Sequence, residues 1–189
     1  MDHSKALPIQ HQVGKISKEI FIIISGSIFL ALLSQLAIPM PFTPIPMTLQ
    51  TLGVFLLGGI LGGRRAAYST MTYLVQGCCG LPVFAGGMAN PLWFLDCKAG
   101  FLISFIAAAF LIGKMIEKSK PNLMYILFSL TLGQILISGI GMAWLSLYFG
   151  IHASFMIGVL PFLSGAAVKI LTGSLFLKGY FKLRQVTWQ

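Results

Sequence analysis

One lysine lies inside an apolar stretch near the end of the chain, and it is the residue with the clearest chemistry. Lys169 comes more than two helical turns before the next basic residue, Lys178. A lysine at the centre of a membrane helix costs about 3 kcal/mol on insertion scales, so it usually faces a cavity or a partner. Small side chains surround it at helical spacing and leave room for a ligand: Gly165, Ala166, Thr172 and Gly173.

The chain offers Lys169 few acidic partners. No apolar stretch carries an acid in its interior; Glu19 and Glu117 border apolar stretches, and Asp96 lies in a connecting segment. Three alternatives remain for the ammonium group. It snorkels to lipid headgroups, it pairs with Asp96, or it binds an anion from outside. An anionic ligand such as a carboxylate fits this depth best.

Composition identifies the class of protein. The chain is 57% hydrophobic and 9% charged, with a mean hydropathy of +0.89, whereas soluble domains carry about 25% charged residues. This composition predicts an integral membrane protein. The chain has no phosphate-binding G-x-x-x-x-G-K-[ST] motif, no catalytic triad pattern and no paired carboxylates. We therefore expect no enzyme activity, no cofactor and no metal site.

The basic residues are distributed unevenly. Eleven of the thirteen lie in the N-terminal tail, at Arg64-Arg65, in the linker 114–120 or in the C-terminal tail. The positive-inside rule places these four segments, and so both termini, in the cytoplasm. Because the charges border apolar stretches, the net charge of +9 indicates contact with anionic lipid headgroups and not with nucleic acid. The polar segment 1–18 has no small-residue cleavage site and predicts no removable signal peptide.

Six apolar stretches predict an all-α bundle of six transmembrane helices in a single domain, residues 1–189. The expected helices cover residues 20–38, 47–62, 66–79, 99–116, 123–148 and 153–177. The third is too short to cross a core of about 30 Å. The apolar segment 80–98 that follows must therefore dip into the membrane or be covered by protein. The segment 39–46 has four prolines, so it is expected to be extended and to form a wall or lid.

Several polar, aromatic and small residues have two readings. Gln50 caps or joins helices, or contacts a ligand; Trp93 anchors the chain at the lipid interface, or stacks on a ring-shaped ligand. Gln134 and Ser138 belong to a small and polar stripe on the fifth helix. Ser27 and Ala31 form a small-xxx-small pair that packs inside the bundle or docks a membrane partner.

Four sequence runs resemble one protein family over nearly the whole chain. They are Pro44-Ile-Pro-Met-Thr-Leu-Gln-Thr-Leu-Gly53, Leu61-Gly-Gly-Arg-Arg65, Leu81-Pro-Val-Phe-Ala-Gly-Gly87 and Pro161-Phe…Gly165…Val168-Lys169. The chain resembles the BioY family, the biotin-binding S components of energy-coupling factor (ECF) transporters. The resemblance implies biotin capture at the outer side of a bacterial plasma or inner membrane. It also implies a membrane-embedded coupling subunit and two cytoplasmic ATPases as partners, although uptake by the bundle alone stays open.

The resemblance also assigns site residues. It implies that Lys169 holds the biotin carboxylate or another polar end, and that Gly86, Gly87 and Asn90 lie beside the pocket.

Two segments depart from the family pattern. The run Asp96-Cys-Lys-Ala-Gly-Phe101 replaces G-P-T-G-G-Y, and Ala166 replaces the acid of G-D-x-x-K. We expect Asp96 or Asn90 to supply the missing acceptor and Lys98 to add a cation. The alternatives are an S component for another vitamin or carboxylate, and a structural membrane protein whose lysine snorkels.

Overall fold

The chain forms a bundle of helices. The computed structural model describes residues 6–118 and 122–186, with side chains for 13–118 and 122–184. Within these ranges, six helices have twelve or more residues, and they confirm the predicted all-α bundle. They are α1 (Ala6–Gln35), α2 (Gln50–Leu61), α3 (Gly63–Cys78), α4 (Ala99–Glu117), α5 (Leu123–Phe149) and α7 (Leu163–Val186).

Four helical stretches are long and apolar enough to cross a membrane. They are Val13–Gln35, Ala99–Glu117, Leu123–Phe149 and Ile151–Arg184, while Gln50–Leu61 is apolar but shorter. The 16 residues of α3 span about 24 Å at 1.5 Å per residue. This length agrees with the expectation that the third helix alone is too short to cross the bilayer.

The first two helices differ from their predicted limits. The polar N-terminal segment continues α1 back to Ala6, and α1 ends at Gln35. The chain then forms a small antiparallel ladder between β1 (Ala37–Ile38) and β2 (Met47–Thr48). The prolines between these strands lack backbone donors and favour extended conformations. As a result the second helix begins at Gln50 and not at residue 47.

The predicted helix over residues 153–177 is wrong, because the structure divides this stretch into three pieces. A short helix, α6 (Ile151–Gly158), is followed by a 3-10 turn, η4 (Leu160–Phe162), and then by α7. Val159 leaves the helical region, with φ −121° and ψ −57°. Pro161, which lacks a backbone N–H, follows directly. The break turns the chain back toward the bundle before α7 begins.

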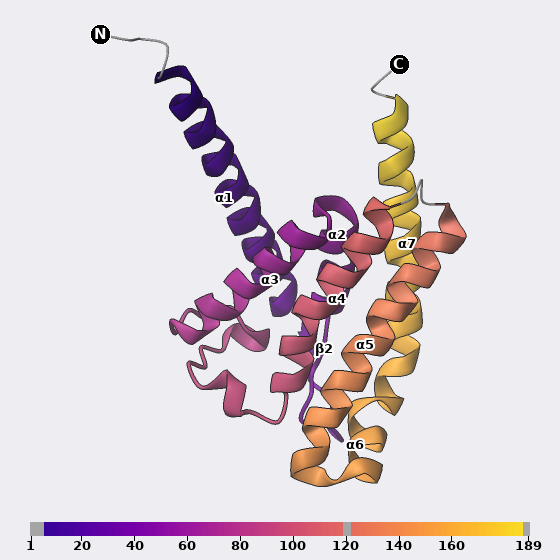
Figure 1. Cartoon of the computed structure of the whole chain (residues 1–189). Coiled ribbons are helices and arrows are strands. Elements are labelled where there is room, and N and C mark those ends of the chain that lie inside the picture. Colours follow the sequence, from indigo (N-terminus) through magenta and orange to yellow (C-terminus); the bar gives the residue numbers. More distant parts are fainter. Residues whose placement is uncertain (1–5, 119–121, 187–189) are drawn as a thin grey trace.

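Helix α4 lies at the centre of the bundle. It packs against α2, α3 and α5, while α1 covers α3 and α2, and α7 covers α5 and α2 (Figure 1). Small residues allow the closest approach: a Cβ on Gly113 of α4 would lie 2.5 Å from the Gly63 Cα at the start of α3. The core of the bundle includes the fully buried side chains of Phe55, Tyr73 and Ile112.

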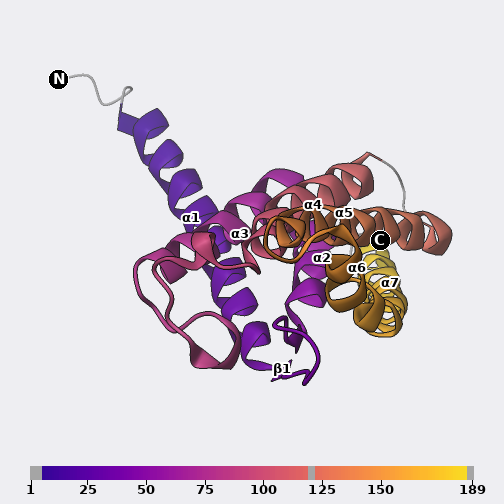
Figure 2. The same ribbon diagram turned by 90° about the horizontal axis from the view of Figure 1, so that it is seen from below.

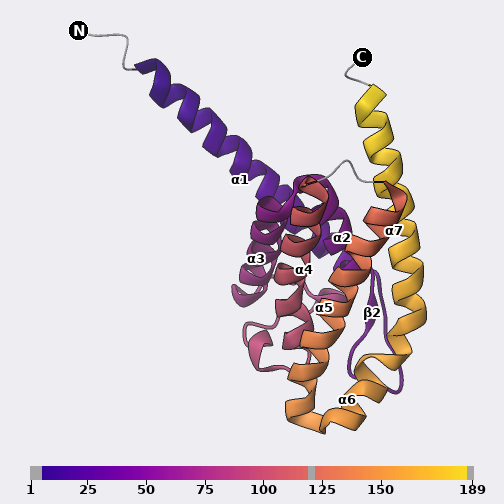
Figure 3. The ribbon, with the colours of Figure 1, turned by 45° about the vertical axis from the view of Figure 1, so that its right-hand side comes forward.

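The two ends of the bundle differ in character. The start of α1, the α2–α3 turn and the last turns of α4 and α7 share one end (Figures 1 and 3). We call it the basic end, because it carries Arg64, Arg65, Lys114, Lys118 and Lys182. The other end, the loop end, holds α6 and the segments 39–46 and 79–98. Figure 2 views the molecule from this side. Lys5 and Lys120, which belong to the predicted cytoplasmic charges, lie outside the described residues.

Two ion pairs, one between helices and one within a helix, lie at the basic end. Arg65 of α3 binds Glu19 of α1 with an N–O distance of 2.5 Å, and Lys114 binds Glu117 within α4 at 2.7 Å. The Glu117 carboxylate also accepts a hydrogen bond from the Gly63 backbone N–H at 3.0 Å. It thereby satisfies one of the free donors at the start of α3.

Candidate ligand-binding site

A cavity of about 540 Å³ lies between the helices and the segments of the loop end. Its volume falls in the usual range of small-molecule sites. Apolar side chains form much of its wall, and polar residues contribute from α2, α4, α5, α7 and two connecting segments. These polar lining residues are Thr48, Gln50, Thr51, Asn90, Asp96, Lys98, Gln134, Ser138 and Lys169.

Lys169 lines this cavity from α7, beside Ala166. Its ammonium group has no ion pair and no hydrogen bond with any part of the chain that the structure describes. The alternative in which Asp96 pairs with Lys169 is therefore not the arrangement found. A cation that is half-buried and free of protein partners is suited to hold an anionic group.

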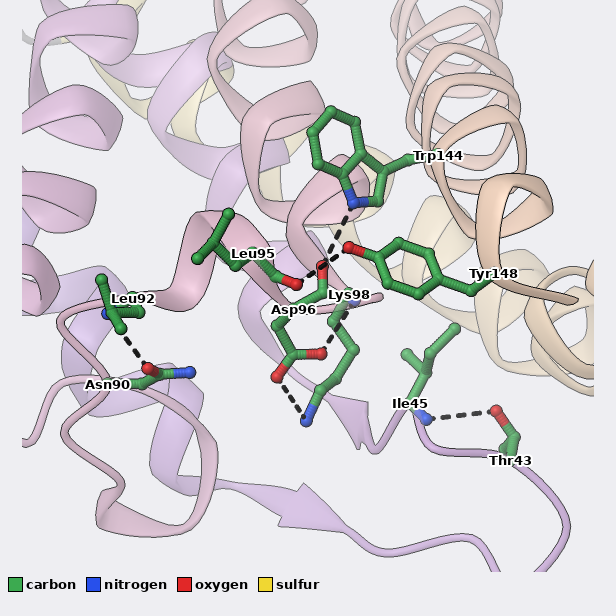
Figure 4. Close-up of polar contacts among 9 residues, drawn as sticks. All are labelled: Thr43, Ile45, Asn90, Leu92, Leu95, Asp96, Lys98, Trp144 and Tyr148. Carbon is green, nitrogen blue, oxygen red and sulfur yellow. Dashed lines mark hydrogen bonds and ion pairs between the residues drawn. The ribbon is translucent and has the colours of Figure 1, made fainter.

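Asp96 pairs with Lys98 instead (Figure 4). One carboxylate oxygen accepts from the Lys98 backbone N–H at 3.1 Å, and the other lies 3.5 Å from the Lys98 Nζ. Both residues line the cavity. With Lys169 included, the charges in the lining are two positive and one negative, a balance suited to a monoanion.

Helix α5 holds the segment that carries this pair. The Trp144 indole donates to the Asp96 carbonyl at 3.1 Å, and the Tyr148 hydroxyl donates to the Leu95 carbonyl at 2.8 Å (Figure 4). These donors replace the water that irregular backbone needs. Trp144 and Tyr148 were not predicted, although aromatic donors at the end of an apolar helix are a usable signal.

The end of α1 holds the other side of segment 79–98. The Ser34 hydroxyl is 2.6 Å from the Val83 carbonyl, and the Gln35 amide donates to the Phe84 carbonyl at 3.2 Å. This apolar segment is thus tied to protein on both sides. The pattern agrees with the expectation that protein covers its irregular backbone.

Two aromatic side chains from this segment form one wall of the cavity. Phe84 and Trp93 are buried, and their ring centroids lie 6.2 Å apart in an edge contact. The Trp93 indole N–H donates to the Cys78 Sγ at 2.9 Å. Since Trp93 is only 8% exposed, it lies inside the fold and not at a lipid interface. Its ring is available to pack against an apolar part of a ligand.

Asn90 lines the cavity, and Gly86 and Gly87 do not. The Asn90 Oδ1 accepts from the Leu92 backbone N–H at 3.1 Å (Figure 4), which leaves its amide nitrogen for other contacts. Gly86 and Gly87 have φ of 74° and 71°, values that favour glycine. They form the turn that brings the backbone of residues 84 and 88 together, so their role here is conformational.

Gln50 lines the cavity, but its amide already binds protein groups. Its Oε1 accepts from the Thr48 hydroxyl at 3.2 Å, and its Nε2 donates to the Tyr73 hydroxyl at 2.5 Å. The second bond joins α2 to α3. Two roles were expected for Gln50, capping or joining helices and contacting a ligand. This geometry is that of a residue that joins two helices.

Sequence reasoning left out several lining residues. Gln134 and Ser138 come from α5, and Phe101, Phe105 and Phe162 add apolar surface. The polar stripe on the fifth helix was a signal for the first two. The break at Val159 brings Phe162 into the lining, and no local pattern in the sequence revealed it.

Ser27 lies fully buried where α1 packs on α3. Its hydroxyl accepts from the Gln76 amide at 3.2 Å, and Ala31 is half-buried against the core. These positions correspond to packing inside the bundle. A docking role for Ser27 and Ala31 stays a prediction.

The fold and the cavity together define a class: helical membrane proteins with the S-component fold. A solved crystal structure, described as the S-component for biotin from an ECF-type ABC transporter, superimposes with a TM-score of 0.79 at 28% identity. The match covers 91% of this chain and 93% of that one.

The family follows from sequence comparison. The sequence model of the BioY family matches residues 4–185. A probable biotin transporter BioY of Pyrococcus horikoshii is 34% identical over 77% of this chain and 87% of its own length. The biotin transporter BioY of Thermotoga maritima is 33% identical over 81% and 91%, respectively. The chain belongs to the BioY family and is an integral membrane protein.

Proposed function

We propose that this protein binds biotin within the membrane as the substrate-binding subunit of an uptake system. The observation that carries the proposal is that Lys169, which has no ion pair among the described residues, lines a cavity of about 540 Å³ in a chain of the BioY family. Biotin carries one carboxylate, a cyclic urea and an apolar ring. A cavity with a surplus positive charge, neutral polar groups and an aromatic wall suits these three parts.

In this proposal, Lys169 binds the carboxylate and the aromatic wall of Phe84 and Trp93 packs against the ring. Asn90 and the Asp96–Lys98 pair contact the ligand from segment 79–98, since all three line the cavity. Gly86 and Gly87 act indirectly by shaping the turn. Binding and release need no covalent chemistry, so we propose no enzyme activity.

The test is binding of labelled biotin to the purified, detergent-solubilised protein and to Lys169→Ala. We expect saturable binding by the wild type and about 10–100-fold weaker binding by the variant, the usual effect of losing a charge-assisted hydrogen bond. Absence of saturable binding by a folded wild-type protein contradicts the proposal.

A second candidate is an S component for another small carboxylate. The specific observation behind it is Ala166, which lines the cavity without contributing a polar side chain. A panel of unlabelled vitamins in competition with labelled biotin distinguishes the two candidates. If another carboxylate displaces biotin at lower concentration than biotin itself, the second candidate replaces the first.

We further propose that both termini are cytoplasmic, since the basic end carries Arg64, Arg65, Lys114 and Lys118. A membrane-embedded coupling subunit and two cytoplasmic ATPases then complete the transporter, unless the chain acts alone. Biotin uptake in cells with and without such a module decides between these modes. Ser27→Leu with Ala31→Leu tests docking: uptake falls while binding persists if the pair docks a partner, and binding falls too if the pair packs the bundle.

A further inference from the structure

Helix α5 presents an unusual pair of polar side chains to the cavity. Gln134 and Ser138 are one helical turn apart, and both line the cavity. The Gln134 Nε2 donates to the Ser138 Oγ at 3.1 Å, while the Gln134 Oε1 is buried and accepts no hydrogen bond within the described residues. A buried acceptor without a partner costs about 1–3 kcal/mol. The pair is therefore incomplete as it stands.

Ser138 differs from the other hydroxyl residues of α5. Ser129, Thr131 and Ser146 each donate to a backbone carbonyl one turn earlier, the common arrangement within helices. The Ser138 Oγ accepts from Gln134 and donates to no group in the described part of the chain. The pair thus keeps one acceptor, the Gln134 amide oxygen, and one donor, the Ser138 hydroxyl.

Three other polar side chains of the lining already bind protein groups. The Gln50 amide binds Thr48 and Tyr73, and the Asn90 oxygen binds a backbone N–H. The Asp96 carboxylate binds Lys98. The Gln134 amide oxygen, by contrast, is a buried acceptor that no described group occupies, so it is open to a neutral N–H donor on a ligand.

The packing of α5 on α7 places this pair close to Lys169 in depth. Gly173 of α7 packs against Leu130 of α5. Lys169 and Gln134 each lie one turn from that contact toward the loop end, because the two helices run in opposite directions (Figure 1). The cation and the neutral pair consequently lie on adjacent walls of one cavity.

We infer that Gln134 and Ser138 bind the polar edge of a cyclic urea or amide, in which an N–H lies beside a C=O. The Gln134 Oε1 accepts from the ligand N–H, after a rotation about the soft terminal torsion of the side chain. The Ser138 hydroxyl donates to the ligand carbonyl. This inference rests on the proposed function, and it assigns the recognition of the biotin urea to α5.

The test compares biotin with its two carbamate analogues, in each of which a ring oxygen replaces one ureido N–H. Binding of each ligand is measured for the full-length wild type, Gln134→Met, Gln134→Glu and Ser138→Ala. The wild type is expected to prefer biotin over one analogue by about tenfold. In Gln134→Met this preference falls to near one, because the acceptor is gone, and Gln134→Glu retains it. Ser138→Ala weakens biotin and both analogues alike, by roughly three- to tenfold, since all three keep the carbonyl.

Thr131→Val is the matched control, because Thr131 lies on the exposed side of α5 and does not line the cavity. It should bind all three ligands as the wild type does. If Gln134→Met keeps the wild-type preference while biotin still binds, the inference is overturned and the proposed function stands. If wild-type protein does not bind biotin, both are overturned.

Discussion

Two lysines line the cavity, and their surroundings differ in charge. Lys98 lies 3.5 Å from the Asp96 carboxylate, whereas Lys169 has no ion pair among the described residues. A ligand carboxylate must compete with Asp96 for Lys98, but it meets no competitor at Lys169. The free energy gained on binding an anion should therefore come mainly from Lys169.

This difference gives a prediction for the two methionine variants. Lys169→Met should weaken biotin binding by about 10–100-fold, and Lys98→Met should weaken it less. Biotin amide, which lacks the negative charge, should bind wild type and Lys169→Met with similar affinity. Equilibrium binding of both ligands to the three proteins measures these effects. An equal loss of biotin and biotin amide in Lys169→Met would show that Lys169 only supports the fold.

A second residue-scale prediction concerns the buried bond between Gln50 and Tyr73. Tyr73→Phe removes the acceptor of the Gln50 Nε2 and leaves a buried N–H without a partner. The free energy of unfolding should fall by about 1–3 kcal/mol, as measured by chemical denaturation in detergent. Tyr68→Phe is the control, because Tyr68 is 54% exposed and should change stability little. Equal stability of the two variants would argue against a joining role for Gln50.

The sequence predicted site residues where a residue type was unusual for the segment that carries it. A charge in an apolar stretch identified Lys169, and a lone loop acid identified Asp96, both of which line the cavity. The pairing of Asp96 with Lys98 depends on a local turn that composition does not specify. The unused hydrogen-bonding groups of Gln134 and Ser138 depend on which backbone carbonyls their side chains reach, so the sequence alone could not predict them.

At the scale of elements, glycine decides how closely α3 and α4 approach. A Cβ on Gly113 would lie within 2.5 Å of backbone atoms at residues 62 and 63, and backbone cannot move aside as a flexible side chain can. Gly113→Ala should therefore lower the free energy of unfolding by about 1–3 kcal/mol. Thermal unfolding in detergent measures the change.

Gly139→Ala provides a matched control in the neighbouring helix. A Cβ at Gly139 meets nothing within 4 Å, and alanine favours the helix over glycine by about 1 kcal/mol. This variant should be as stable as the wild type or more stable. If both alanine variants behave alike, the close contact of α4 with the α2–α3 turn does not limit stability.

The loop that carries Asp96 is held by two donors from α5, and this suggests a prediction for kinetics. Tyr148→Phe removes the bond to the Leu95 carbonyl and should loosen segment 79–98 where it borders the cavity. The dissociation rate of biotin should rise several-fold with a smaller change in the association rate. Stopped-flow displacement measures both. Tyr125→Phe, which removes a bond to the Met115 carbonyl near the basic end, should leave the dissociation rate unchanged.

Hydrophobic stretches predicted the long helices well and their ends poorly. The fourth and fifth helices match within a few residues, since α4 covers Ala99–Glu117 and α5 covers Leu123–Phe149. The last helix was mispredicted because the apolar run continues unbroken through Val159 and Pro161. Hydrophobicity does not distinguish a helix from a covered turn at membrane depth. The short β1–β2 ladder was missed for the same reason.

In the molecule as a whole, most basic side chains lie at one end of the bundle and the cavity lies toward the other. Most of the basic side chains, with the ion pairs of Arg65 and Lys114, gather at the basic end, while the cavity-lining segments 39–46 and 79–98 lie at the loop end (Figure 1). If the basic end faces the cytoplasm, the cavity is closer to the outside. Capture of an external ligand follows directly from that orientation. A measurement of orientation is therefore also a test of capture from outside.

The chain's own cysteines report on orientation. Cys78 and Cys79 are exposed at the loop end of α3, so a membrane-impermeant maleimide should label them in intact cells. Burial raises the pKa of the Cys97 thiol, with a further contribution from Asp96. At a given pH a smaller fraction of Cys97 is thiolate, so it should react with the maleimide more slowly than Cys78 and Cys79. Lys182→Cys in a Cys78→Ser, Cys79→Ser, Cys97→Ser background places a single thiol near the basic end, and it should react only after permeabilisation. The opposite result would be labelling of Lys182→Cys in intact cells and no labelling of Cys78 and Cys79 in the intact-cell wild type. It would show that the cavity lies on the cytoplasmic side, which is incompatible with capture from outside.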